Sequence, residues 1–91
     1  MYKVSDTVRS THSQDGAIVL DIRQGEMFNL NPVGSRILEL LKSGSTEAAV
    51  IDEISRQFSA NRAVVERDVQ EFVASLQEHR LIVDTKANGR K

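Results

Sequence analysis

The chain has 91 residues, the length of one domain, and its 40% hydrophobic and 27% charged residues are typical of a globular protein. It has no cysteine, which excludes disulfides, thiolate catalysis and Cys-ligated metal sites. The net charge is -1, without the basic excess usual in nucleic-acid-binding domains. No apolar run approaches the ~20 residues of a membrane span, and no secretory signal is visible, so we expect a cytoplasmic protein without a membrane partner.

The first third of the chain predicts β-strands. Residues 3–8 contain β-branched residues in loose alternation, whereas residues 9–15 are polar and predict a loop. A strong strand pattern follows from Gly16 to Ile22, and a return strand covers residues 26–30. Together these segments predict a three-stranded antiparallel meander.

The loop between the last two strands determines which side chains share a face. A two-residue loop at 24–25 sets Asp21 opposite Phe28, whereas a three-residue loop at 23–25 sets Leu20 opposite Phe28. We prefer the three-residue loop, because such loops favour Gly in the left-handed position that Gly25 supplies. It places five apolar side chains on one face: Ile18, Leu20, Ile22, Phe28 and Leu30.

The rest of the chain has helical periodicity. Asn31-Pro32 is typical of a helix start, with Asn as N-cap, and Gly44 ends this helix. Ser45 or Thr46 caps a second helix. The break at residues 59–61 separates it from a third helix, for which Asn61 is the expected cap.

The third helix is the longest, covering roughly residues 62–79, and a short apolar segment follows at 81–83. Residues 85–91 are polar and basic, and we expect a disordered tail there. The fold class is therefore α+β: a three-stranded antiparallel meander followed by a three-helix bundle, similar to a winged helix-turn-helix. We assign the domain to residues 1–84.

Catalysis is poorly supported by the sequence. His12 lies among polar residues of the expected loop, and His79 lies at a helix end, where a cation is favourable. No group of His, Asp and Glu has the spacing of a metal site, and no Gly-rich loop could hold a phosphate. We therefore expect no enzymatic activity, no metal and no cofactor.

A winged-helix DNA-binding regulator is the main alternative. Between Thr46 and Arg80 the chain has four basic and seven acidic residues, a net charge of -3 on the two helices that would approach DNA. Because DNA affinity comes largely from Lys and Arg neutralising phosphates, the charge disfavours a nucleic-acid partner.

The last strand of the meander offers another kind of binding. If residues 26–30 form a free edge, their unpaired N–H and C=O groups can accept a peptide as an added strand. The alternative, which the residues leave open, is that the chain's own helix or tail covers this edge.

Two motifs carry a resemblance to a known family. Residues 15–22 (DGAIVLDI) and 25–34 (GEMFNLNPVG) follow its "DG-apolar-LLD…G-x-aromatic-aromatic-x-LN-x-x-G" pattern. The helical half matches its "DV-x-x-FL-x-x-L-x-x-x-GLL" ending at Asp68-Val69, Phe72, Leu76 and Leu81-Ile82. Over nearly the whole chain, from Val4 to Val83, the sequence resembles the pyrroloquinoline quinone peptide-chaperone (PqqD-like) family. It departs from the pattern at Met27, the first aromatic position, and at Arg80, the usual Gly.

The resemblance implies a non-catalytic recognition element for ribosomally made, post-translationally modified peptides. Such a domain binds the precursor's leader as an antiparallel strand on the hairpin edge, against the last long helix, and presents the precursor to a maturation enzyme. The sequence looks closest to free-standing members of lasso-peptide clusters, whose partners would be a leader peptidase and a macrocyclase. A radical-SAM maturase is the other possibility.

The expected peptide-binding site consists of the edge strand and one face of the last helix: Glu26, Met27, Phe28, Asn29, Leu30, Val65, Asp68, Val69 and Phe72. Phe28 and Leu30 would form the groove floor, and Val65, Val69 and Phe72 would take apolar leader side chains. Asp68 would accept a hydrogen bond from the leader or pair with a leader cation. The alternative for Asp68 is a structural contact with Arg23 or Arg36.

Overall fold

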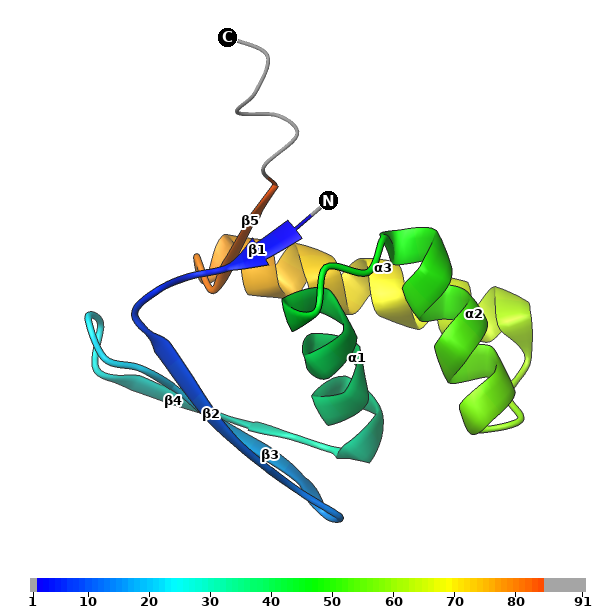
Figure 1. The fold of residues 1–91 in the computed structure, drawn as a ribbon, viewed down its shortest axis with the longest axis horizontal. Coiled ribbons are helices and arrows are strands. Elements are labelled where there is room, and N and C mark those ends of the chain that lie inside the picture. Colours follow the sequence, from blue (N-terminus) through cyan, green and yellow to red (C-terminus); the bar gives the residue numbers. More distant parts are fainter. Residues whose placement is uncertain (1, 85–91) are drawn as a thin grey trace, which may run out of the picture.

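A computed structural model describes residues 2–84, and the expected tail at 85–91 lies outside the described residues. A three-stranded sheet lies on one side of α1, and α2 and α3 lie on the other (Figure 1). The elements in chain order are β1 (Tyr2–Val4), β2 (Val8–Ser13), β3 (Gly16–Asp21), β4 (Glu26–Leu30), α1 (Pro32–Lys42), α2 (Glu47–Gln57), α3 (Arg62–Glu78) and β5 (Ile82–Asp84). The predicted α+β fold, a meander followed by three helices, is confirmed.

The antiparallel sheet has the order β2-β3-β4, but its first strand differs from the expectation. A strand at 3–8 and a loop at 9–15 are both wrong, because β2 covers most of the polar segment. The inward side chains of β2 include Ser10 and His12, which find polar partners on α1. A polar strand of this kind carries no apolar alternation for a sequence pattern to reveal.

The β3–β4 hairpin has a four-residue loop at 22–25, so the predicted three-residue loop is wrong. The loop is held by Asp21, which is 1% exposed and whose carboxylate accepts the backbone N–H groups of Arg23 and Gln24. Val19 therefore lies opposite Phe28, and the predicted apolar face is split between the two sides of the sheet. Phe28 and Leu30 face inward with Ala17 and Val19, whereas Ile18 and Leu20 are 50% and 38% exposed.

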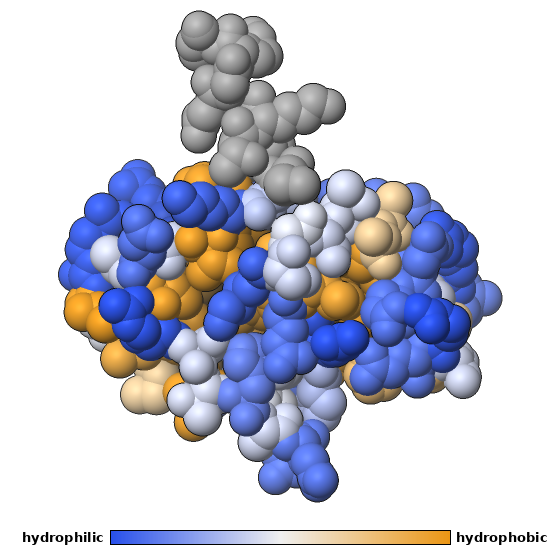
Figure 2. All heavy atoms as spheres, viewed as in Figure 1, coloured by the Kyte–Doolittle hydropathy of each residue, from blue (hydrophilic) through white to orange (hydrophobic). Residues whose placement is uncertain are grey.

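The outer face of the hairpin is consequently apolar at several positions. Ile18, Leu20, Ile22 and Met27 are all exposed there. Figure 2 shows apolar atoms among hydrophilic ones at the end of the molecule where the β3–β4 loop lies.

The predicted helix starts are confirmed by the hydrogen bonds of their caps. The Asn31 side chain accepts the N–H of Gly34 at 2.8 Å, and the Thr46 hydroxyl accepts the N–H of Ala49 at 3.1 Å. The Asn61 side chain caps α3 in the same way. Each cap satisfies N–H groups that lack a partner within the first helical turn.

The ends of the described chain form a second sheet that the sequence did not predict. β1 pairs antiparallel with β5, with Lys3 opposite Val83. The helices meet in one core, whose buried members are Val19, Ile37, Leu38, Leu41, Val50, Ile51, Ile54, Val65, Val69, Val73, Leu76, Leu81 and Ile82. This core fixes α3 relative to the sheet and thereby positions the site described next.

Candidate functional site

The edge of β4 is free, since β4 pairs only with β3 among the described residues. The direction of its backbone groups follows from the Ile22 N–H, which donates to the Thr7 carbonyl on the β2 side of the sheet at 2.9 Å. Hydrogen-bonding direction alternates along an antiparallel strand, so residues 17, 19 and 21 bond toward β4. Their partners on β4 are residues 30, 28 and 26. Met27 and Asn29 therefore direct their N–H and C=O groups outward, which is the arrangement that an added strand needs.

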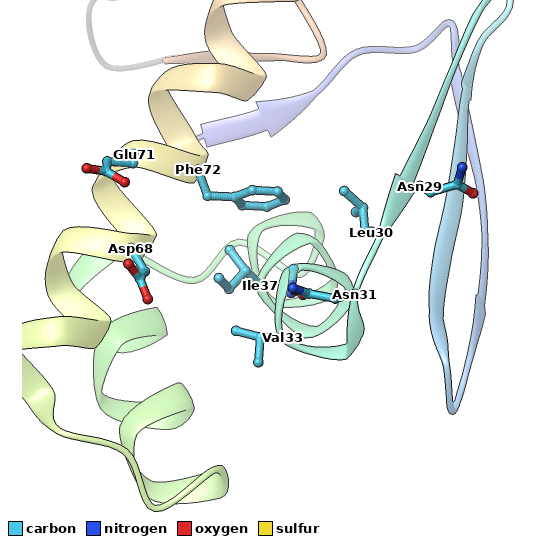
Figure 3. Close-up of a pocket in the computed structure, with 9 residues that line it drawn as sticks. Asn29, Leu30, Asn31, Val33, Ile37, Asp68, Glu71 and Phe72 are labelled. Carbon is cyan, nitrogen blue, oxygen red and sulfur yellow. Dashed lines mark hydrogen bonds between the residues drawn. The ribbon is translucent and has the colours of Figure 1, made fainter.

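A groove lies beside this edge, between the start of α1 and the middle of α3. Its cavity has a volume of about 490 Å³, and its lining residues are Asn29, Leu30, Asn31, Val33, Gly34, Ile37, Asp68, Glu71 and Phe72. Figure 3 shows the Phe72 ring reaching from α3 toward Leu30 on β4. The groove thus has an added-strand position along one side and a helix along the other.

The groove combines an apolar floor with a polar rim. Leu30, Ile37 and Phe72 provide the apolar surface, and the carboxylates of Asp68 and Glu71 lie on the α3 side (Figure 3). Neither carboxylate makes a hydrogen bond or ion pair with another residue described by the structure. The rim can therefore accept hydrogen bonds or a positive charge from a bound molecule.

A second, smaller cavity continues the groove along α3. It has a volume of about 50 Å³ and shares Leu30 and Phe72 with the first. Its other lining residues are Val19, Phe28, Ser75, Leu76, His79 and Leu81. The Phe28 and His79 rings meet edge to face, with centroids 5.1 Å apart, and form the end of this apolar space.

Four of the nine expected site residues line the groove: Asn29, Leu30, Asp68 and Phe72. Phe28 lines the small cavity, whereas the side chains of Glu26 and Met27 are exposed away from both. Val65 and Val69 are buried in the core, 5% and 0% exposed, and line neither space. They were selected because they share a helix stripe with Asp68 and Phe72, but both belong to the buried core.

The structural alternative for Asp68 is wrong, because no ion pair joins it to Arg23 or Arg36. Arg36 instead contacts Glu39 and Glu53. Three residues of α1 that were not expected at the site, Val33, Gly34 and Ile37, also line the groove. The sequence did contain an indication that α1 contributes, since the LN-x-x-G motif of the family resemblance includes Gly34.

Gly34 lies where α1 approaches both the sheet and α3. A Cβ at this position would lie 3.5 Å from Leu30 Cβ and 3.5 Å from Phe72 Cε1. The missing side chain therefore leaves part of the groove open.

His12 has a structural environment rather than the expected place in a solvated loop. Its Nδ1 is 2.6 Å from the Ser35 hydroxyl on α1, and its Nε2 is 3.1 Å from Ser10 on the same strand. Glu39 Oε2 lies 3.6 Å from Nδ1. Ser35 is buried, 5% exposed, and its hydroxyl is engaged by His12. The contacts join β2 to α1.

No group of three or more described His, Asp or Glu residues converges on a possible metal site. Likewise, none of the described helices has the length and apolarity to cross a membrane.

Comparison with known proteins agrees with this geometry. Residues 16–82 match the family described as "Coenzyme PQQ synthesis protein D (PqqD)". The chain belongs to the PqqD family. No curated protein sequence gave a match.

Two solved structures of similar fold contain leader peptides. One is "TbiB1 in Complex with the TbiA(beta) Leader Peptide", with 38% identity, a TM-score of 0.81, and coverage of 88% of this chain and 93% of that one. The other is "Lasso peptide synthetase B1 complexed with the leader peptide", with 25% identity and a TM-score of 0.81. Coverage there is 91% of this PqqD-family chain and 98% of the other.

Proposed function

We propose that this chain is a leader-peptide recognition element for a ribosomally synthesised, post-translationally modified peptide. It binds the leader as a fourth, antiparallel strand on β4, and leader side chains on one face enter the groove against α3. The observation that carries this proposal is the free edge of β4, with the outward backbone groups of Met27 and Asn29 lying beside an apolar groove. Main-chain hydrogen bonds supply affinity in this mode, and side-chain pockets supply specificity.

The two similar structures, both of which are complexes with a leader peptide, support a choice of pathway. One is described as "Lasso peptide synthetase B1", so we place this chain in a lasso-peptide pathway. Its partners are then the precursor's leader, a leader peptidase and a macrocyclase, acting in the cytoplasm where the precursor is made. A radical-SAM maturase is the second choice of partner.

The domain contributes binding and no chemistry of its own in this proposal. It acts by holding the leader-bearing precursor near the maturation enzyme, which raises the effective concentration of the substrate. Addition of the protein should therefore lower the enzyme's KM for a leader-bearing precursor. Modification of the precursor by this chain alone would contradict the non-catalytic role.

The test of binding uses the TbiA(beta) leader peptide, labelled with a fluorophore, and titration with this protein followed by anisotropy. We expect saturable binding that unlabelled leader displaces. A random DNA duplex at physiological salt serves as the control for the winged-helix alternative, and only weak binding is expected. Nanomolar, sequence-specific DNA binding without leader binding would overturn the proposal.

A further inference from the structure

The loop between β3 and β4 is tied to the end of α3 through one side chain. We propose that Gln24 is a positioning residue, which holds the hairpin against α3 and so fixes the width of the groove at its His79 end. This inference rests on the proposed leader-binding function, because the groove that Gln24 spans is the leader site. It concerns a residue that lines neither cavity.

The anchor of this arrangement is the buried carboxylate of Asp21. It accepts hydrogen bonds from the Thr7 hydroxyl at 3.3 Å and from the backbone N–H groups of Arg23 and Gln24 at 3.1 and 3.3 Å. It also accepts one from the Gln24 side-chain amide. These bonds, the Gln24 amide foremost, hold the pKa of Asp21 below its ordinary value, so the anchor is charged at neutral pH.

Gln24 makes two contacts with its single amide nitrogen. Nε2 donates to the Asp21 carboxylate and, at 3.1 Å, to the backbone carbonyl of His79. A primary amide has two N–H donors, so both are used. The His79 carbonyl lies at the C-cap of α3, where a helix leaves its carbonyls without an internal partner.

The position of this bridge connects it to the groove. It is the only hydrogen bond between the β3–β4 hairpin and α3 or its C-cap within residues 2–84. Next to it, the rings of Phe28 and His79 meet and form the end of the small cavity. Without the bridge, the hairpin tip can move away from α3. Leader binding must then order the hairpin and α3 relative to each other. Such ordering lowers affinity, since a preformed site avoids that cost.

The orientation of the leader gives the bridge a defined place along it. An antiparallel leader runs from Leu30 toward Glu26, so its C-terminal end leaves the groove at the Gln24 bridge. This is the end that continues into the segment to be modified. The bridge therefore fixes the point from which the rest of the precursor extends.

The experiment compares Gln24→Met with a stability-matched control. Met has nearly the length of Gln but no N–H donor, and residue 24 is exposed, so the variant should fold. The control is Thr46→Ala, which removes the cap hydrogen bond of α2 far from the groove. For each protein we would measure the thermal midpoint and the Kd and dissociation rate of the labelled TbiA(beta) leader.

We expect Gln24→Met to raise the Kd about three- to tenfold, mainly through faster dissociation, as is usual for changes at one interface. Thr46→Ala should lower the thermal midpoint at least as much and leave the Kd unchanged. Gln24→Lys should retain affinity, because an ammonium group can also donate to both acceptors.

Equal Kd values for Gln24→Met and the unmodified protein would overturn the inference and leave the leader-binding function standing. A Gln24→Lys variant as weak as Gln24→Met would also overturn it, since donation would then not be the property that matters. If the unmodified protein does not bind the leader, the proposed function fails, and the positioning role fails with it.

Discussion

Proline substitutions on β4 give a test that depends on backbone direction alone. Met27 and Asn29 point their N–H groups outward, whereas the N–H of Phe28 bonds to β3. Proline has no N–H, and it is tolerated on an edge strand where that group faces solvent. Met27→Pro and Asn29→Pro should therefore fold, whereas Phe28→Pro should lose the hairpin.

The size of the effect follows from one missing donor. A hydrogen bond contributes about 0.5–1.5 kcal/mol net, and a desolvated carbonyl left without a donor costs about 1–3 kcal/mol. Each 1.4 kcal/mol is a factor of ten in Kd, so one proline should weaken leader binding by about 10- to 100-fold. The proline ring also occupies space that the added strand would use, which increases the loss.

Fluorescence anisotropy with the labelled TbiA(beta) leader gives the affinities, and circular dichroism confirms the fold of each variant. Met27→Ala is the matched control, because it keeps the N–H and removes a side chain that lies outside the groove. It should bind within about twofold of the unmodified protein. Folded Met27→Pro and Asn29→Pro proteins that both keep full affinity would show that the leader does not use this edge.

Three further variants separate stability from binding. Gly34→Ala should stabilise α1 by about 1 kcal/mol but weaken leader binding, because its methyl group enters the groove beside Phe72. The thermal midpoint should therefore rise while the affinity measured by anisotropy falls. A variant in which stability and affinity rise or fall together would contradict this reasoning. Arg80 has a φ of 62°, so Arg80→Gly should raise the unfolding free energy by about 1 kcal/mol, and an unchanged denaturation midpoint would argue against strain there. The pKa of Asp21 is lowered in the folded state, so its stabilising effect is present above the ordinary value of 3.8 and is lost as pH falls through the folded value. The unfolding free energy should therefore fall less steeply below pH 4 in Asp21→Asn than in the unmodified protein. Equal slopes in the two proteins would contradict a lowered pKa of Asp21.

The helices were predictable because their signals are local. Asn31, Thr46 and Asn61 are cap residues, and each precedes a 3.6-residue apolar period, so the helix starts follow from the sequence alone. Arg80, noted as a departure from the family's usual Gly, takes the left-handed conformation that explains why Gly is usual there.

The strands were less predictable because their partners are distant. The β1–β5 pair joins the two ends of the domain, and β2 is polar on its inner face, so neither has a local pattern. The hairpin register places the Asp21 carboxylate inward, where hydrogen bonds from Arg23 and Gln24 offset the cost of its burial. Apolar alternation alone favoured Ile18 and Leu20 as inward residues, and the structure places both outside.

The site was predictable where a motif specified its backbone. The edge strand followed from its free backbone groups and from the family resemblance, and its Phe28, Asn29 and Leu30 line the groove or its extension, as do Asp68 and Phe72 of α3. Val65 and Val69, chosen with Asp68 and Phe72 by helical spacing, are buried in the core, because that spacing identifies a face of α3 but not how deeply other elements cover it.

Amide hydrogen exchange, followed residue by residue by NMR, tests the added strand most directly. In the free protein the N–H groups of residues 26, 28 and 30 face β3 and should already be protected, whereas those of Met27 and Asn29 should exchange rapidly. Saturation with the TbiA(beta) leader should protect Met27 and Asn29 strongly and change the other three little. Saturated protein in which Met27 and Asn29 still exchange at their free rates would contradict strand addition at β4.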